Sequence, residues 1–382
     1  MKVLIVDPGG FSPPYDLSLV RSLREQGADV RFLAPEQLML MWQDPDALPA
    51  KLANFSERIV GSLAKRASYV RVLQATFSSV RNWEPDIVHF QWLPFPLIEY
   101  QLLKSISRGP KMVFTMHNVG SAHEPRGGIR SLRRREAYKL FDRVIVHSRY
   151  SMNEALLQGL VSREKLSVIQ HGALTHYRDL AAGVEKAGGE RVRILFIGSI
   201  KPYKGLDYLI KAFATVEQLY SSSNWELCIA GKPSYDLSSL KRDIEAVGLR
   251  DRVNWLTRHL SEREYAELLH LSDVVVLPYT GIDQSGVLMA AIGMGKPVVA
   301  TRVGAFPELL TSGEHGLLVE PENATALALA LHQLVESPCQ RNEIAKNLAV
   351  LASTTLSWSN LAKQTIDVYE DVLRRQHSYA YA

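Results

Sequence analysis

The order of structural elements is clearest in residues 278–308, PYTGIDQSGVLMAAIGMGKPVVATRVGAFPE. The residues just before this stretch, 274–277, form a β-branched apolar run, which predicts a buried strand. Ser285 has the N-cap chemistry of a helix over 286–294, and an apolar strand resumes at 297–300. A strand, a helix and a second strand in this order predict one βαβ unit of a parallel sheet.

The predicted helix start at Ser285 and Gly286 comes directly after a strand of that sheet. The first amides of a helix have no acceptor within the helix, so their N–H groups point past the end of the sheet. Such an arrangement binds anions, and it suits a diphosphate well. We therefore expect the amides of Ser285, Gly286 and Val287 to bind phosphate.

A basic motif follows an earlier strand, in residues 196–207, FIGSIKPYKGLD. Lys201 and Lys204 flank a Pro-Tyr turn, and a helix is expected to start near Gly205. Two ammonium groups beside a helix N-terminus suit pyrophosphate. Loop lysines are usually just solvated, but together with the helix start at Ser285 this motif predicts phosphate binding. No Walker sequence and no GxGxxG occurs, which argues against a kinase and against hydride transfer.

The composition is that of a large globular enzyme with two domains. The chain has 382 residues, of which 46% are hydrophobic and 22% are charged. Its cysteines, Cys228 and Cys339, form neither a disulfide framework nor a metal spacing, which favours a reducing compartment. The first ten residues read as a strand and its turn, and no apolar run approaches the ~20 residues of a membrane helix. We therefore expect a cytoplasmic protein, with contact to a membrane surface left open.

Basic residues are concentrated in the first half of the chain. Residues 1–180 carry 24 lysines and arginines against 17 acidic residues, and the excess lies mainly in 58–81 and 126–143. Basic and apolar positions alternate at helical spacing in 58–81, which fits a solvated helix face or a helix lying on an anionic membrane. The solvated face is the favoured interpretation. Nucleic-acid binding is not expected, because no recognition motif accompanies the charge.

Strand and helix patterns alternate in two successive sets. The first set has strands at 3–6, 30–33, 87–90, 112–116, 144–147 and 167–169. The second set has strands at 193–197, 227–230, 253–255, 274–277, 298–301 and 317–319. Buried strands that alternate with helices predict the α/β class, with two Rossmann-like, doubly wound parallel sheets.

A small, Gly-rich segment divides these two sets. We expect a first domain at 1–180, a linker at 181–190 and a second domain at 191–356. The terminal segment 357–382 contains a helix at 358–374, which is expected to pack back on the first domain. Ligands of such folds bind outside the carboxyl ends of the strands, so the cleft between the two sheets is the expected site.

Motifs along almost the whole chain resemble those of the GT-B glycosyltransferases of the retaining family 4 type. They are HFQWLP (89–94), TMHNVGSAHE (115–124), DRVIVHS (142–148), IQHG (169–172), GSIKPYKGLDYLI (198–210), residues 278–301 and GAFPELLTSGEHGLLVEPEN (304–323). The resemblance implies that the second domain holds a nucleotide-diphosphate sugar and the first an acceptor, such as a glycan or a polyprenyl-linked saccharide. It also implies retention of the anomeric configuration, with no metal or other cofactor required.

The chain departs from the family at two carboxylates. The family commonly has two glutamates, separated by seven residues, and the matching positions here are Ile282 and Ala290. The sequence resembles a variant in which Gln284 and Ser285 face the donor. This departure puts the donor assignment in question, whereas the intact phosphate-binding motifs favour an active enzyme.

Other positions take over family roles in this interpretation. Asp283 or Glu308 is a candidate acceptor for a donor hydroxyl. The arginine that often follows the first glycine of the phosphate loop is Ser199 here, and Lys201 is its natural substitute. The donor and diphosphate contacts are thus expected from Gly9, Gly10, Ser199, Lys201, Lys204, Asp283, Gln284, Ser285, Gly286, Val287 and Glu308.

His117 follows the predicted strand 112–116, where a side chain can enter the cleft. The family equivalent contacts the donor sugar and helps to position the reacting groups; the plain alternative is a structural hydrogen bond at a strand end. With Lys204 and Gln284 it forms the expected catalytic set. His171 fits a structural role as well as it fits a donor contact. The histidine spacing is not that of a zinc site, so no metal is expected.

Other residues of the first domain are candidates for substrate contact. Trp92 follows a strand end, where its ring either stacks on a sugar or packs in the core. The loop 121–128 contains two glycines and fits an acceptor wall or a lid. Gly9 and Gly10 end the first strand, where the backbone passes close to a phosphate or simply turns tightly. The acceptor candidates are Trp92, His123, Glu124 and Arg126.

The sequence therefore predicts a hexosyltransferase that moves a sugar from a UDP- or GDP-sugar to a glycan or lipid-linked saccharide with retention, in polysaccharide or glycoconjugate biosynthesis. One alternative is a non-catalytic nucleotide-sugar-binding partner of a glycan assembly complex. Another is a nucleotide-sugar epimerase of related fold, which would need paired carboxylates near the anomeric carbon, and these are missing. Product formation distinguishes the enzyme from the binding partner.

Overall fold

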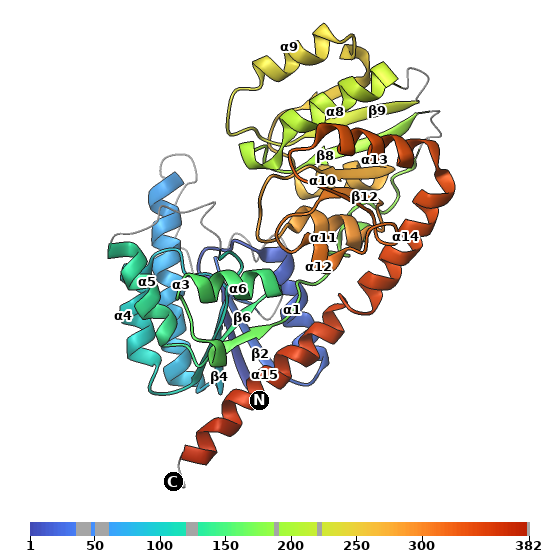
Figure 1. Ribbon diagram of the computed structural model, residues 1–382. Helices are drawn as coiled ribbons and strands as arrows, with labels where there is room; N and C mark the ends of the chain where they lie inside the picture. The colour runs from blue at the N-terminus through green and yellow to red at the C-terminus, as the bar shows by residue number, and fades with distance from the viewer. Residues whose placement is uncertain (36–46, 50–60, 120–128, 187–190, 220–223, 380–382) are drawn as a thin grey trace. The chain divides into compact units, whose positions relative to one another are not determined.

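The chain folds into two compact units (Figure 1). The first unit contains Met1–His171 and Trp358–Ala382, and the second contains Gly172–Ser357. The computed structural model describes residues 1–35, 47–49, 61–119, 129–186, 191–219 and 224–379 of the chain.

The division between the units lies before Gly172, earlier than the predicted boundary at residue 180. Residues after this point pack on the second unit, since the amide of Leu174 donates to the Met289 carbonyl and the Tyr177 hydroxyl donates to Glu262. Lys186, in the segment predicted as a linker, pairs with Asp273. The boundary at 180 and the linker over 181–186 are thus corrected, and 187–190 lie outside the described residues.

The first unit is built on a seven-stranded parallel sheet in the order β3-β2-β1-β4-β5-β6-β7. The strands are β1 (Lys2–Val6), β2 (Asp29–Ala34), β3 (Ala47–Pro49), β4 (Ile87–Phe90), β5 (Lys111–Thr115), β6 (Arg143–Val146) and β7 (Leu166–Val168). The sequence pattern did not predict β3, because Ala-Leu-Pro has no β-branched residue and is too short to show an alternation.

Helices cover both faces of this sheet. They are α1 (Pro13–Glu25), α3 (Gly61–Trp83), α4 (Pro96–Ile106), α5 (Ile129–Lys139), α6 (Arg149–Leu157) and α15 (Trp358–Tyr379). Side chains of a strand alternate between the two faces. Leu4 and Val6 of β1 therefore join one buried cluster with residues of α3 to α6, while Val3 and Ile5 join another with residues of α1 and α15.

The last helix, α15, returns the chain to the first unit (Figure 1). Its residues Leu361 and Tyr369 are buried in the cluster shared with α1. The Tyr369 hydroxyl lies 2.6 Å from Nδ1 of His89 on β4, and Asp371 pairs with Arg143 at the start of β6. The helix ends at Tyr379, beyond the predicted end at residue 374.

Helix α3 carries the described part of the basic pattern predicted over 58–81. Its inner face buries Tyr69, Val72 and Leu73. Arg71 is half-buried and Arg81 is exposed, and residues 58–60 lie outside the described residues. Within the part of the chain that the structure describes, no helix is both long enough and apolar enough to cross a membrane.

The second unit is built on a six-stranded parallel sheet in the order β10-β9-β8-β11-β12-β13. The strands are β8 (Val192–Ile197), β9 (Trp225–Ala230), β10 (Val253–Leu256), β11 (Val274–Leu277), β12 (Val298–Thr301) and β13 (Leu317–Val319). The helices are α7 (Tyr177–Leu180), α8 (Leu206–Leu219), α9 (Ser238–Ala246), α10 (Glu262–Leu271), α11 (Gly286–Gly293), α12 (Phe306–Leu309), α13 (Ala324–Glu336) and α14 (Pro338–Ser353). The predicted fold class, two doubly wound parallel sheets, is confirmed.

Each sheet reverses its strand order at one point. In the first unit β1 lies between β2 and β4, and in the second β8 lies between β9 and β11. The connections that follow β1 and β4 run in opposite directions, as do those that follow β8 and β11. This opens a crevice beyond the carboxyl ends of each pair. The loops that follow β1 and β4, and those that follow β8 and β11, are therefore the places to look for a ligand site.

Candidate active site

Lys204 lies at the centre of the crevice in the second unit. It is in the short 3-10 helix η3 (Pro202–Lys204) after β8, and only 7% of the residue is exposed. A Cβ placed on Gly198, at the end of β8, would lie 3.0 Å from the Lys204 ammonium and 3.2 Å from the Val287 side chain. The ammonium group therefore lies between the end of β8 and the first turn of α11.

The described residues do not neutralise the charge of Lys204. Burial lowers its pKa, and among the described residues no carboxylate pairs with its ammonium group. The aromatic ring of Tyr279 lies below it, with the nitrogen 5.2 Å from the ring centroid. A buried ammonium that has an aromatic face but no carboxylate beside it among the described residues is costly in the free protein, and an anionic ligand would remove that cost.

Two glycines bring the loops of this site together. Gly205 has φ +67°, and a Cβ there would lie 1.9 Å from the Pro278 carbonyl oxygen at the end of β11. Gly304 has φ +52°, and a Cβ there would lie 1.7 Å from the Ile282 carbonyl oxygen. Only glycine permits both the left-handed backbone and the close approach. The loops after β8, β11 and β12 are consequently packed on one another.

Helix α11 begins in the same place. The Ser285 hydroxyl accepts the amide of Leu288, so Ser285 is its N-cap, and the helix starts at Gly286 as predicted. The amides of Gly286 and Val287 belong to the first turn, where no intrahelical acceptor exists. Gly286 is exposed and Val287 is buried. The structure therefore brings the predicted helix start and the predicted lysine to one site.

The side chains expected to face the donor differ in their surroundings. Gln284 is half-buried, and its Oε1 is buried without a hydrogen-bond partner among the described residues. Asp283 is buried, with its backbone carbonyl accepting the amide of Ala305. Glu308, in α12, is exposed. Gln284 is thus the side chain with an unused acceptor.

The other residues predicted to bind phosphate in the loop after β8 are more exposed. Ser199 is exposed and Lys201 is half-buried. The Lys201 ammonium lies 6.0 Å from the centroid of the Tyr203 ring, and its backbone carbonyl accepts the amide of Lys204. Lys201 therefore shapes the turn that carries Lys204 and keeps its own charge near solvent.

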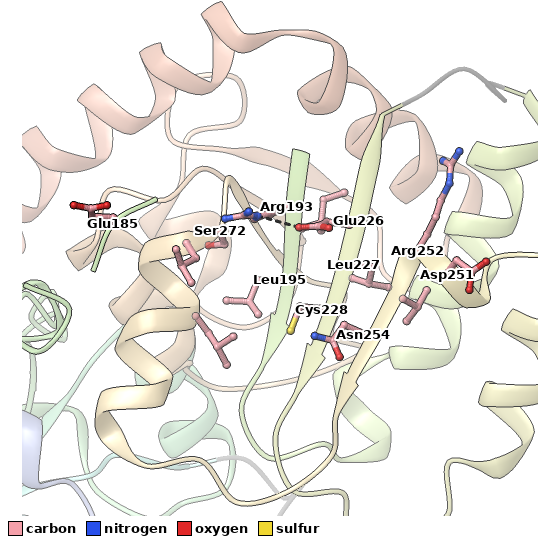
Figure 2. A pocket seen from close by; sticks show the side chains of 14 residues that line it. Glu185, Arg193, Leu195, Glu226, Leu227, Cys228, Asp251, Arg252, Asn254 and Ser272 are labelled. Carbon is pink, nitrogen blue, oxygen red and sulfur yellow. Dashed lines mark hydrogen bonds and ion pairs between the residues drawn. The ribbon is translucent and has the colours of Figure 1, made fainter. Parts of the chain in front are cut away.

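A separate cavity of about 590 Å³ lies near the amino ends of strands of this sheet, whereas Lys204 follows a carboxyl end (Figure 2). Its lining comes from the starts of β8, β9 and β10, including Arg193, Glu226 and Val253, and from the end of α10. Figure 2 shows Arg193 pointing toward Glu226, with which it forms a 3.0 Å ion pair. Because the phosphate loops follow the ends of the strands, this cavity is not the predicted donor site.

Among the described residues, His117 in the first unit is held by the rings of Trp92, Tyr15 and His147 and by two hydrogen bonds. Trp92 stacks on it with ring centroids 4.8 Å apart and planes 9° apart, and Tyr15 contacts it edge-on. Its Nε2 lies 3.2 Å from Gln91 Oε1, and its Nδ1 lies 3.2 Å from His147 Nε2. Burial, with His147 next, lowers the pKa of His117 well below its usual value. The ring is therefore neutral near pH 7.

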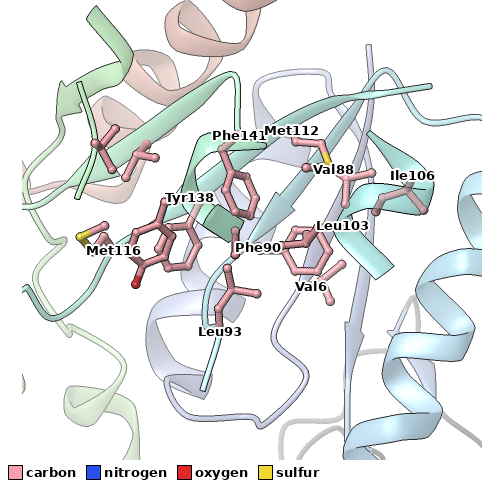
Figure 3. Close-up of a cluster of buried hydrophobic side chains, with 14 of the residues drawn as sticks. Val6, Val88, Phe90, Leu93, Leu103, Ile106, Met112, Met116, Tyr138 and Phe141 are labelled. Carbon is pink, nitrogen blue, oxygen red and sulfur yellow. The ribbon is translucent and has the colours of Figure 1, made fainter. Parts of the chain in front are cut away.

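The strand ends that carry these residues rest on the apolar core of the first unit. Leu93 and Met116, which follow β4 and β5, are buried in one cluster with Phe90 and Tyr138 (Figure 3). Trp92 directly precedes Leu93, and His117 directly follows Met116. Their positions are therefore set by a packed layer, which is the arrangement that a precise site requires.

Gly9 and Gly10 lie in a loop whose amides are already used. The Asp7 carboxylate accepts the amides of Gly9 and Gly10 with Oδ1 and those of Phe11 and Ser12 with Oδ2. In this loop the N–H groups of Gly9 and Gly10 are directed to Asp7, and the expected donor contact of the two glycines stays a prediction. The tight-turn interpretation fits, since Gly10 has φ +60°.

Sequence reasoning missed four residues of these sites. Asp7 organises the loop after β1, Gln91 and His147 contact His117, and Tyr279 lies under Lys204. A buried aspartate directly after an apolar strand, before two glycines, is a signal that could have been used for Asp7. The other three lie at or near predicted strand ends, which was a signal, but their roles depend on contacts between distant segments.

Part of the predicted acceptor site lies outside the described residues, namely His123, Glu124 and Arg126. Trp92 is half-buried, and its indole N–H donates to the Ser12 hydroxyl while its face covers His117. Over the described residues, no group of three or more His, Cys, Asp or Glu side chains is arranged to hold a metal ion.

Comparisons with known proteins agree with this architecture. Residues 16–176 match a model described as Glycosyltransferase Family 4, and residues 191–337 match one described as Glycosyl transferases group 1. The chain is 31% identical to the MMP alpha-(1->4)-mannosyltransferase of Mycolicibacterium hassiacum over 59% of this chain and 53% of that one. It is 27% identical to the phosphatidyl-myo-inositol mannosyltransferase of Mycobacterium leprae over 97% of both. Several of the curated relatives are matched over only about half their length.

Solved structures share the fold at low identity. The Anabaena protein HepE, in complex with UDP and glucose, has a TM-score of 0.71 at 20% identity, with 97% of this chain and 100% of that chain covered. Sucrose-phosphate synthase from Thermosynechococcus elongatus has a TM-score of 0.70 at 17% identity, with 98% and 100% covered. These likenesses show the GT-B fold. With the two family models matched in order along both units, the chain belongs to the glycosyltransferases of group 1 and family 4.

Proposed function

We propose that the protein is an active glycosyltransferase that uses a nucleotide-diphosphate sugar, a UDP- or GDP-sugar, and retains the anomeric configuration. One observation carries the proposal most: the buried Lys204 ammonium, which pairs with no carboxylate among the described residues, lies beside the end of β8 and the first turn of α11. A nucleoside diphosphate brings two phosphates, one for the lysine and one for the helix amides.

The chemistry of the leaving group explains why this arrangement suits transfer. When the glycosidic bond to the donor breaks, negative charge builds on the β-phosphate. A fixed ammonium and the amides of Gly286 and Val287 stabilise that charge without rearrangement, because they are already in place. This is the role that a divalent cation has in other enzymes, so we propose that none is required.

One side chain is proposed to contact the sugar, and a second to position the reacting groups. Gln284 Oε1, which is buried and lacks a partner among the described residues, would accept a donor hydroxyl. His117 would help to position the reacting groups. Asp283 and Glu308 remain candidates for a second hydroxyl acceptor, in place of the glutamates that Ile282 and Ala290 replace.

A glycan or lipid-linked saccharide is the proposed acceptor, and an anionic bilayer the proposed surface on which it is met. On the first unit, Leu97 and Ile98 of α4 and Leu132 of α5 are 49%, 52% and 60% exposed. The α5 sequence IRSLRRREAYK is rich in arginine. Exposed apolar side chains beside cationic ones suit a membrane interface.

The competing function is a binding partner without catalysis, and the absence of carboxylates at Ile282 and Ala290 favours it. Thermal stabilisation by UDP, GDP, ADP and their sugar conjugates tests donor binding first. Lys204→Met should lose the shift, and Lys211→Met, on the outer part of α8, should keep it. Transfer to a saccharide acceptor, with the product anomer assigned by NMR, then separates the two functions, because binding without product would establish the partner.

Vesicle pelleting tests the membrane surface separately. Binding should require anionic lipid and weaken with salt, and Leu132→Glu should reduce it while donor-induced stabilisation stays unchanged. No pelleting at low salt would make a soluble acceptor the better proposal.

A further inference from the structure

The hydrogen bonds around His117 determine which of its nitrogens carries the proton. His147 Nδ1 lies 2.9 Å from the Ile169 carbonyl oxygen, which can only accept, so His147 carries its proton on Nδ1. Burial lowers the pKa of His147 to about 4, so the ring is neutral near pH 7 and its Nε2 is a bare acceptor.

The next hydrogen bond follows from the first. Nε2 of His147 faces Nδ1 of His117 at 3.2 Å, and two acceptors cannot bond, so Nδ1 of His117 must donate. A neutral imidazole has one N–H, so Nε2 of His117 is a bare acceptor as well.

This assignment also orients Gln91. Its Oε1 lies 3.2 Å from the bare Nε2 of His117, while its Nε2 is buried and has no partner among the described residues. Exchanging the two ends of the amide places an N–H on the bare nitrogen. This exchange removes the contact between the two acceptors. It also gives the buried Gln91 N–H a partner, and an unpaired N–H is more costly than an unpaired carbonyl oxygen.

We propose that Gln91 and His147 are positioning residues which lock His117 as the neutral, Nδ1-protonated tautomer within a one-directional chain of hydrogen bonds. The chain runs from the Gln91 amide to His117, from His117 to His147, and from His147 to the Ile169 carbonyl. Trp92 covers one face of the His117 ring and restricts its rotation, while the hydrogen bonds at the two nitrogens determine its tautomer.

The lock has a consequence for the reaction, which rests on the proposed function. His117 offers the substrate no N–H group, and the nitrogen that it shares with Gln91 can only accept a hydrogen bond. It therefore acts by orientation and not by giving a proton. Free histidine favours the opposite tautomer, so the lock is directly observable.

The first test is NMR of histidine-labelled protein without any donor, using long-range 1H–15N correlations at neutral pH. The rings of His117 and His147 should each show a protonated Nδ1 and a bare Nε2. Substitution of each of these two histidines assigns its signals. A protonated Nε2 on His147 or His117 would overturn the proposal. This measurement needs no activity, so it separates failure of the lock from failure of the proposed function.

Two substitutions of His147 form a matched pair. In His147→Gln the side-chain oxygen can replace Nε2 as acceptor, so His117 should keep its tautomer. In His147→Leu the acceptor is gone, and His117 should move its proton to Nε2 and donate to Gln91 Oε1. With donor and acceptor present, we expect His147→Leu to lower kcat about 10- to 100-fold with little change in KM, and His147→Gln to retain most of it.

Wild-type kcat in His147→Leu would also overturn the positioning role. If His147→Leu does not fold, the tautomers of the wild type and of His147→Gln decide the question on their own.

Discussion

At the scale of single residues, the second unit's candidate site is marked by buried polar groups that lack an ionic or hydrogen-bond partner among the described residues. Lys204 is buried with no carboxylate partner among the described residues, and Gln284 Oε1 is buried with no hydrogen bond there. Each costs stability, and each is the chemical complement of a group on a sugar diphosphate. Local departures from good packing of this kind are expected where binding takes place.

Lys204→Met should separate stability from function. Removing a buried, unpaired charge should leave the free energy of unfolding of the free protein unchanged or raise it. Donor affinity should fall by ~1.5–3 kcal/mol, the value of a charge-assisted hydrogen bond. Chemical denaturation and calorimetric titration with the selected nucleotide measure the two effects. Lys211→Met is the control, and unchanged nucleotide affinity in Lys204→Met would remove the phosphate assignment.

Asp7 and Asp16 offer a second test, because they are neighbouring buried carboxyls, and backbone amides bond to Asp7 but not to Asp16 among the described residues. Burial raises the pKa of both carboxyls. The four amides that Asp7 accepts favour its ionised form and oppose this shift, whereas the neighbouring Asp7 raises the pKa of Asp16 further, well above its usual value. Asp7→Asn should therefore destabilise the first unit by about 1–3 kcal/mol. Asp16→Asn, which resembles the protonated acid, should cost much less in urea denaturation. Equal losses would mean that the proton is not held by Asp16.

At the scale of elements, loops and not side chains assemble the proposed donor site. The turn before α8 packs against the end of β11 because Gly205 is left-handed and carries no Cβ. The amide of Thr280 donates to the Tyr203 carbonyl and joins the same two loops. The position of Lys204 is thus a property of the contact between β8 and β11, which are neighbours only in the folded sheet.

Gly205→Ala tests this contact against a matched glycine. Gly248 has a similar backbone, with φ +73° against +67°, but no atom lies within 4 Å of the position of its Cβ. Gly248→Ala should therefore cost only the backbone strain, ~1 kcal/mol, and leave nucleotide binding intact. Gly205→Ala adds a clash with the Pro278 carbonyl, so it should cost more and weaken nucleotide binding. Thermal melts with and without nucleotide compare them, and equal behaviour would contradict the role of the contact.

At the scale of the whole molecule, buried ionisable groups of the first unit give its stability opposite dependences on pH. Burial lowers the pKa of His89 to about 3 and of His147 to about 4, from about 6.5 when unfolded. Between those values the unfolded chain binds more protons, so stability is lost as pH falls from 6.5 to 4. Glu99 has its pKa raised by burial to about 7, so its contribution is lost as pH rises from 4.5 to 7.

Glu99→Gln should therefore steepen the rise of stability with pH between 4.5 and 6.5. Each unit of difference between a folded and an unfolded pKa corresponds to about 1.4 kcal/mol, so the change is measurable. Urea denaturation of the wild type and the variant at a series of pH values provides the comparison. A variant curve parallel to that of the wild type would show that Glu99 does not titrate as proposed.

The sequence by itself determined the elements, and for a physical reason. Strands buried on both faces must be continuously apolar, as 274–277 are, and a helix that follows such a strand needs a capping residue such as Ser285. Both signals are local, so eleven other strands and the start of α11 could also be placed from them. The three residues of β3 carry no such signal and were missed. The family motifs, likewise, are contiguous in the chain.

Only the tertiary structure decided which residues meet. It placed Lys204 against Gly198 and Val287, took the amides of Gly9 and Gly10 for Asp7, and moved 172–186 to the second unit. It also joined His117, which follows β5, to His147, which follows β6. These contacts link segments far apart in the chain, and their energies come from packing and hydrogen bonding in three dimensions. No local pattern encodes them, because a side chain has its partners only after the sheet has formed.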